Sequence, residues 1–126
     1  MIIYLVEDDF IYAEFIQKAV SQNSQHIITW FSSAEKCLAV AQKTLPDALI
    51  VDYKLPGMDG VELYKVLQSQ LKDENKYIIM SAIEDGNMVL NFIKQGIRDY
   101  VIKDEHVLDS LIAILEGKED DYYLFS

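Results

Sequence analysis

Cysteine is nearly absent from this sequence, since Cys37 is the only one among 126 residues. A single cysteine excludes an internal disulfide and fits a reducing compartment. Cys37 lies at helical spacing from other small or apolar residues, so we interpret it as a core residue rather than a nucleophile. The two histidines, His26 and His106, match no metal-ligand pair, and surface or edge positions are expected for both.

Long apolar runs and clusters of basic residues are also absent. No run of about 18 apolar residues occurs, and the apolar start of the chain is too short for a signal peptide. We therefore expect a cytoplasmic protein with no membrane partner. The sequence has 11 basic and 21 acidic residues, for a formal net charge of −10. Because neutralising phosphates requires clustered Lys and Arg, no direct nucleic-acid partner is expected.

Short apolar runs alternate five times with longer amphipathic segments. Strands are predicted at residues 2–6, 26–31, 48–51, 77–80 and 100–102, and helices at 10–21, 33–43, 61–71, 85–95 and 105–116. In the first helix, apolar groups recur at helical spacing at Ile11, Phe15 and Ala19, and Ser33 is predicted to cap the second helix. Runs that are apolar on both faces favour a parallel sheet between helices, a doubly wound α/β sandwich.

Chemically reactive side chains follow four of the five predicted strands. They are Glu7, Asp8 and Asp9 after the first strand, Asp52 after the third, Ser81 after the fourth and Lys103 after the fifth. Ligands in such sheets bind beyond the carboxyl ends of the strands, so these residues are expected to meet. Neighbouring carboxylates suit Mg²⁺, and an aspartate is able to act as a phosphoryl acceptor. A lone acid after a strand is usually a turn or capping residue, and it is the joint placement that carries the prediction.

Five motifs together resemble the receiver domains of two-component response regulators, chemotaxis receivers included. They are the segment from Val6 to Asp9, Asp52 after its apolar run, the loop at residues 55–60 (Leu-Pro-Gly-Met-Asp-Gly), Ser81-Ala82, and residues 100–103. The resemblance implies a flavodoxin-like α/β sandwich with a five-stranded parallel sheet in the order 2-1-3-4-5 and five helices. It places the receiver domain at residues 1–117 and leaves an acidic and aromatic tail at 118–126.

The resemblance also implies roles for single residues. Asp52 matches the phosphoacceptor, and Ser81 and Lys103 match the catalytic hydroxyl and lysine that contact the phosphoryl group. For Mg²⁺, the resemblance implies Asp8, Asp52 and the backbone carbonyl of Lys54 as ligands, and Glu7 as the acid that holds metal-bound water. Ser81 and Tyr100 match the pair that switches conformation on phosphorylation. Asp9 lies one position beyond the metal pair and is predicted to cap the first helix.

Asp104 departs from the family pattern, which has proline after the conserved lysine. A cis bond before a non-proline residue costs roughly 2.5–4 kcal/mol, so we expect the Lys103–Asp104 bond to be trans. An alternative role for Asp104 is to cap the last helix.

The predicted function is that of a phosphorelay receiver rather than an enzyme, with at most self-phosphorylation from small phosphodonors and slow autodephosphorylation. The implied partners are a sensor histidine kinase or histidine phosphotransfer protein and a downstream protein target. One alternative is a haloacid-dehalogenase-like phosphatase, but Lys54 stands where that class needs a second acid. Another is a pseudo-receiver that binds without phosphorylation, which the complete residue set argues against. For the tail, a frayed end and a docking segment both remain open.

Overall fold

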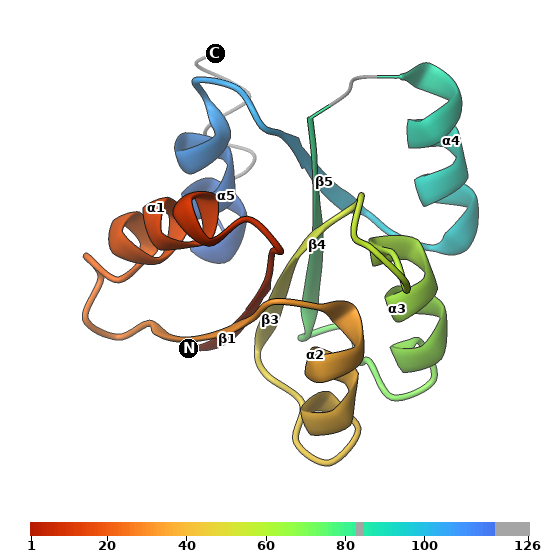
Figure 1. The fold of residues 1–126 in the computed structure, drawn as a ribbon, viewed down its shortest axis with the longest axis horizontal. Coiled ribbons are helices and arrows are strands. Elements are labelled where there is room, and N and C mark those ends of the chain that lie inside the picture. The colour runs from red at the N-terminus through yellow and green to blue at the C-terminus, as the bar shows by residue number, and fades with distance from the viewer. Residues whose placement is uncertain (83–84, 118–126) are drawn as a thin grey trace.

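The computed structural model describes residues 1–82 and 85–117 and shows five parallel strands in one sheet (Figure 1). The strands are β1 (Ile2–Val6), β2 (Ile27–Phe31), β3 (Ala48–Asp52), β4 (Lys76–Ser81) and β5 (Asp99–Ile102). Their spatial order is β2-β1-β3-β4-β5, and every neighbouring pair is parallel. This confirms the predicted flavodoxin-like α/β architecture.

Five helices connect the strands: α1 (Phe10–Val20), α2 (Ala34–Ala41), α3 (Gly60–Leu67), α4 (Gly86–Gln95) and α5 (Val107–Leu115). The Asp9 carboxylate accepts hydrogen bonds from the backbone N–H groups of α1, and the Ser33 hydroxyl does the same for α2. Both predicted caps are therefore confirmed. Helix α4 ends at Gly96, which adopts a left-handed conformation with φ of 97° that disfavours other residues.

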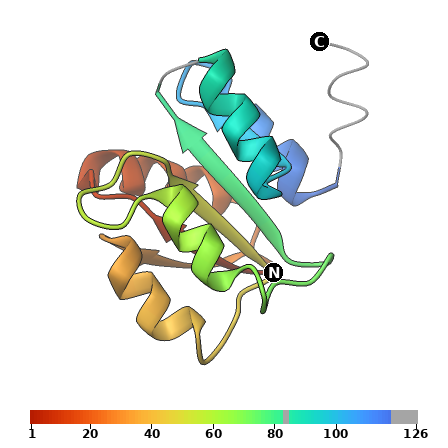
Figure 2. The same ribbon diagram turned by 90° about the vertical axis from the view of Figure 1, so that its right-hand side faces the viewer.

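The helices cover the two faces of the sheet separately. Helices α2, α3 and α4 lie side by side over one face, and α1 and α5 lie over the other (Figures 1 and 2). Successive residues of a strand therefore point into different layers: Ile50 packs beneath α1 and α5, whereas Leu49 and Val51 pack beneath the other three helices. With both layers apolar, β3 is buried along its whole length.

Helix α1 buries a different face from the one its most apolar residues mark in the sequence. Ala13, Ile16 and Val20 are buried against the sheet. Ile11 is 77% exposed and Phe15 is 45% exposed. Periodicity identifies residues that share a face of a helix, but it does not determine which face the sheet covers.

The segment before α5 differs in one respect from its sequence prediction. No cis peptide bond occurs among the described residues, so the Lys103–Asp104 bond is trans as expected. Asp104 does not cap α5, because His106 holds the N-cap position and makes no side-chain capping bond. The Asp104 carboxylate instead accepts a hydrogen bond from the His106 backbone N–H at 2.9 Å, within the turn that precedes the helix.

Several smaller predictions also have structural outcomes. Cys37 is fully buried, and burial raises the pKa of its thiol to about 12, as fits a core residue. His106 is exposed, and His26 lies partly exposed before β2. Within the two described segments, no helix has the length and apolar character needed to cross a membrane. The predicted tail at 118–126 lies outside the described residues.

Candidate functional site at the carboxyl ends of the strands

The parallel register places the ends of four strands beside one another. Val6 of β1 is paired with Val51 of β3, so the residues that follow them are neighbours. Asp52 is paired with Met80 of β4, and Ser81 with Ile102 of β5. Glu7, Asp52, Ser81 and Lys103 therefore converge from distant parts of the chain. The structure brings together the groups that the sequence placed at this edge.

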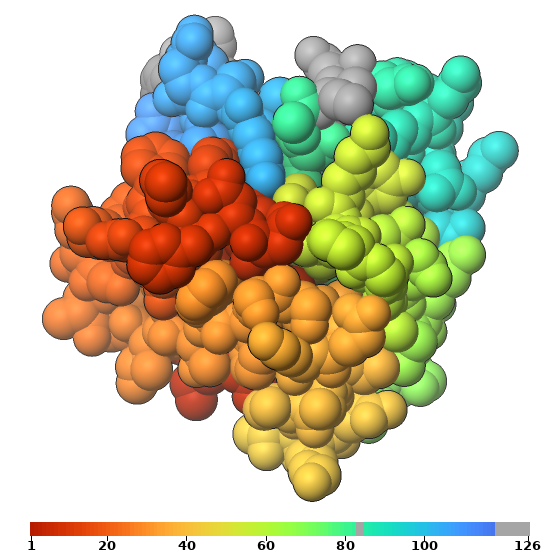
Figure 3. All heavy atoms as spheres, viewed as in Figure 1, coloured from red at the N-terminus to blue at the C-terminus, as the bar shows by residue number. Residues whose placement is uncertain are grey.

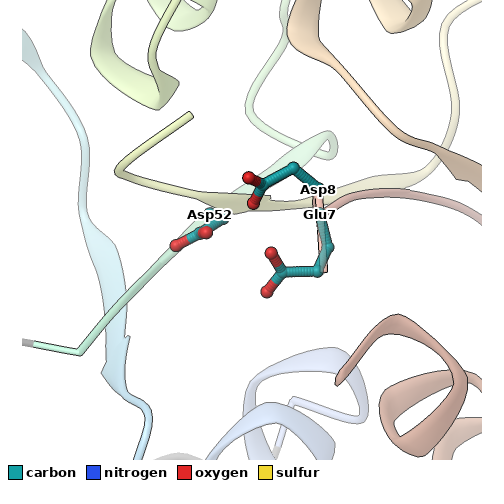
Figure 4. A group of neighbouring side chains, drawn as sticks. All are labelled: Glu7, Asp8 and Asp52. Carbon is teal, nitrogen blue, oxygen red and sulfur yellow. The ribbon is translucent and has the colours of Figure 1, made fainter. Parts of the chain in front are cut away.

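Three carboxylates form the acidic part of the site. Glu7, Asp8 and Asp52 each offer an oxygen, and these atoms all lie within 4.8 Å of one another. Figure 4 shows the three side chains extending toward a shared space from the ends of β1 and β3. Glu7 is fully buried and Asp52 is 6% exposed, whereas Asp8 is exposed to solvent. Because like charges at this separation repel, the cluster is suited to a bound cation.

Lys103 supplies the positive charge of the site. Its Nζ atom lies 2.5 Å from Glu7 Oε1 and 3.2 Å from Asp52 Oδ2. Its backbone N–H donates to the Ser81 carbonyl at 2.8 Å, which fixes its place at the end of β5. Burial lowers the pKa of the Lys103 ammonium, but the hydrogen bond to Glu7 and the charge of Asp52 outweigh it and raise that pKa above its ordinary value. Burial raises the pKa of Glu7 to about 7, against the opposing effect of Lys103.

A cavity of about 110 Å³ opens beside Asp52 and is lined by Asp52, Tyr53, Lys54, Ser81, Ala82, Met88 and Lys103. A water molecule accounts for about 30 Å³ of liquid, so the cavity has room for a group of a few heavy atoms. In Figure 3, atoms of the β1–α1 turn (red) and of the β3–α3 loop (yellow-green) lie next to each other near the centre of the view. An anion in this cavity would lie between the Lys103 ammonium and the Ser81 hydroxyl.

The other predicted residues lie around this cavity. The Lys54 side chain is exposed, and Lys54 contributes to the cavity wall. The Ser81 hydroxyl is 3.8 Å from the Met88 sulfur. Tyr100 is partly exposed, and its ring lies 6.3 Å from the ring of Phe92 on α4.

Glycine is required at the start of α3 for steric reasons. A Cβ atom on Gly60 would lie 2.9 Å from the backbone oxygen of Asp52 and 3.3 Å from Cα of Tyr53. A larger residue would therefore displace the backbone of Asp52 itself.

Two residues near the site escaped the sequence analysis. Trp30 packs against the core, and its Nε1–H also donates to the backbone carbonyl of Glu7 at 2.8 Å. Tyr12 lies one helical turn after Asp8, with its ring centroid 4.5 Å from Lys103 Nζ. The spacing of four residues between Asp8 and Tyr12 was the available signal, but it does not show which way the ring points.

Comparison with known proteins agrees with this geometry. The family model for the response regulator receiver domain matches residues 3–116. The DNA-binding transcriptional regulator NtrC of Escherichia coli strain K12 is 32% identical over 121 residues, which are 96% of this chain and 25% of NtrC. The probable transcriptional regulatory protein NarL of Mycobacterium tuberculosis is 23% identical over 111 residues, which are 87% of this chain and 51% of that protein. The chain thus spans a quarter to a half of these relatives.

Solved structures show the same fold. The receiver domain of the Francisella response regulator 1452 superposes with a TM-score of 0.81 at 24% identity, covering 96% of this chain and 98% of that one. The chemotaxis protein CheY4 of Vibrio cholerae superposes with a TM-score of 0.79 at 20% identity, covering 92% and 96% of the two chains.

These relatives contradict the predicted set of partners. The composition predicted no direct nucleic-acid partner and the resemblance implied a downstream protein target, whereas NtrC is named as a DNA-binding regulator and NarL as a transcriptional regulatory protein. The physical reason for the error is that a net charge of −10 describes only the surface of this chain, which covers one quarter of NtrC. It carries no information about an effector. With the family model matching nearly its whole length, the chain belongs to the response regulator receiver domains of two-component systems.

Proposed function

We propose that Asp52 accepts a phosphoryl group from a phosphohistidine donor in a reaction that requires Mg²⁺, and that the domain then changes conformation to control an effector. The supporting observation is the site itself: three carboxylate oxygens within 4.8 Å of one another, beside the Lys103 ammonium and a cavity of about 110 Å³. A receiver is a signalling domain, and the proposed chemistry extends to self-phosphorylation from small phosphodonors and slow autodephosphorylation. A cytoplasmic location fits this role.

The residues present fit Mg²⁺. Carboxylates and a backbone carbonyl are hard oxygen ligands, and a fully buried Glu7 beside Asp52 needs a positive charge near it. Glu7, Asp8, Asp52 and the carbonyl of Lys54 would hold the ion. When bound, Mg²⁺ would neutralise the carboxylates and the charge on the transferring phosphoryl oxygens.

The chemical step uses side chains at the cavity. An Asp52 carboxylate oxygen attacks the phosphorus atom of the donor, a P–O bond forms, and the P–N bond of the phosphohistidine breaks. The electron pair of that bond returns to the imidazole nitrogen. Lys103 offsets the charge of a phosphoryl oxygen, and Ser81 donates a hydrogen bond to another. Phosphoryl transfer requires mainly positioning and charge neutralisation, which rigid strand ends are well placed to supply.

The output step is proposed to involve Ser81 and Tyr100. A hydrogen bond from the Ser81 hydroxyl that exists only with the phosphoryl group is the kind of differential contact that shifts a two-state equilibrium. Inward rotation of Tyr100, now partly exposed beside Phe92, would fill the space that Ser81 leaves. The names of the relatives support an effector that binds nucleic acid.

Intact-mass measurement with a small phosphodonor tests the proposal. The wild-type protein should gain the mass of one phosphoryl group with Mg²⁺ and none in excess chelator. Asp52→Asn should gain none, and Asp59→Asn provides the matched control, because Asp59 caps α3 outside the cavity. Equal labelling of Asp52→Asn and wild type would exclude Asp52 as the acceptor.

A further inference from the structure

We propose that the ring of Tyr12 is a positioning element for Lys103, holding the ammonium at the phosphoryl cavity while its two carboxylate partners change state. The inference rests on the proposed function and deepens it. It concerns a residue on α1 that is not among the residues lining the cavity.

Three groups hold the Lys103 ammonium in this structure. Two are the carboxylates of Glu7 and Asp52, at 2.5 and 3.2 Å from Nζ. The third is the face of the Tyr12 ring, whose centroid lies 4.5 Å from Nζ, well within the range of a cation–π contact. The lysine side chain is a flexible stem of four carbons, so contacts of this kind determine where its ammonium lies.

The first two contacts do not persist through the proposed cycle. Glu7 and Asp52 both belong to the proposed metal site, and Asp52 is also the group that becomes an acyl phosphate. Their charge toward Lys103 therefore differs between the free and the phosphorylated states. The Tyr12 ring is neither ligand nor reactant, so its attraction for the ammonium is the same in both states. This makes it the constant partner of Lys103.

The hydroxyl group of Tyr12 takes no part in this role. It is buried, and it has no hydrogen-bond partner within residues 1–82 and 85–117. The ring also packs against Phe15, whose ring centroid lies 5.7 Å away. The structure thus assigns the contact with Lys103 to the aromatic face, which phenylalanine would supply equally well.

The test compares Tyr12→Leu, which removes the ring, with Tyr12→Phe, which retains it. The rate of phosphorylation by a small phosphodonor should fall about three- to tenfold in Tyr12→Leu and stay near the wild-type rate in Tyr12→Phe. Beryllofluoride, a phosphoryl mimic that needs Lys103, should bind more weakly to Tyr12→Leu by a similar factor. Affinity for Mg²⁺ alone should be unchanged or higher, because the ring is not itself a proposed metal ligand. A general disturbance of the site would weaken both, which would overturn the proposal.

A second measurement needs neither metal nor phosphorylation. In excess chelator, labelling of the Lys103 amine by an acylating reagent, read by peptide mass spectrometry, should rise in Tyr12→Leu and not in Tyr12→Phe. Lys54, with its exposed side chain, is the internal reference. Phe10→Leu is the matched aromatic-to-leucine control on the same helix, since Phe10 is 62% exposed and packs against Trp30.

The outcomes distinguish a failure of the proposed function from a failure of the proposed role of Tyr12. If wild type is not phosphorylated, the proposed function fails, and the labelling of Lys103 still decides the role of Tyr12. If wild type is phosphorylated and Tyr12→Leu matches it in rate and in labelling, the role of Tyr12 is refuted while the proposed function stands. Loss in both Tyr12→Phe and Tyr12→Leu would also refute it, because the hydroxyl would then be the required group.

Discussion

Alanine substitution of the adjacent acids Asp8 and Asp9 should affect different properties: Mg²⁺ affinity for Asp8 and stability for Asp9. Asp8 contributes an exposed oxygen to the three-carboxylate cluster. Asp9 accepts hydrogen bonds from the backbone N–H groups of Ile11 and Tyr12, at 2.9 and 3.2 Å. One substitution therefore removes a proposed metal ligand, and the other removes a helix cap.

The structure sets the size of each effect. Loss of an N-cap costs about 1 kcal/mol, and for a domain of this length that lowers the melting temperature by about 4 °C. Asp9→Ala should show this loss in excess chelator while retaining most of its Mg²⁺ affinity, because the backbone N–H of Asp9 still donates to Glu7 Oε2. Asp8→Ala should be as stable as wild type or more stable in chelator, since one of three mutually repelling carboxylates is gone. Its affinity for Mg²⁺ should fall at least about tenfold.

Trp30 provides the assay for Mg²⁺. It is the only tryptophan in the chain, and its Nε1–H donates to the backbone carbonyl of Glu7, a member of the three-carboxylate cluster. A fluorescence titration with Mg²⁺ measures the affinity of both variants and wild type, and a thermal melt in chelator measures their stability. Equal losses of Mg²⁺ affinity in Asp8→Ala and Asp9→Ala, or equal losses of stability in chelator, would refute the assignment of Asp8 to the metal site and of Asp9 to the helix cap.

Three further predictions follow from other parts of the molecule. Gly60→Ala should lower both stability and the rate of Asp52 phosphorylation, because the new Cβ meets the Asp52 backbone. Gly86→Ala should be neutral or stabilising by about 0.5–1 kcal/mol, since no atom of the described residues, apart from its chain neighbours and its own helix backbone, lies within 4 Å of the new Cβ. Thermal melts and intact-mass rates compare the two variants, and equal effects would contradict the steric explanation. Cys37, with its pKa raised to about 12 by burial, should resist a thiol reagent at pH 8 in the native protein and react once denatured, so rapid native labelling would place it outside the core. Beryllofluoride should not produce an ion-paired dimer through α5, because residues 105–116 contain no Lys or Arg; a salt-sensitive dimer in sedimentation, lost on charge reversal in α5, would show otherwise.

The local features of this fold were predictable from the sequence because they depend on neighbouring residues. Apolar or β-rich runs of three to six residues marked the strands, and Asp9 and Ser33 marked helix starts through bonds that span only two or three residues. The alternation of these elements then indicated a parallel sheet, and a parallel sheet gathers its strand ends at one edge. The meeting of Glu7, Asp52 and Lys103 was therefore foreseeable, although 96 residues separate Glu7 from Lys103.

Tertiary packing decided the features that periodicity leaves open. The sequence marks Ile11 and Phe15 as apolar, but the sheet covers the face of α1 that carries Ala13 and Ile16, whose side chains fill the layer between this helix and the strands. The same rotation of α1 turns Tyr12 toward Lys103. Likewise, the charge of the chain could not reveal an effector class, since charge reports on the surface that carries it. The sequence by itself determined which groups reach the site, and only the packing of helix against sheet determined which of their neighbours hold them there.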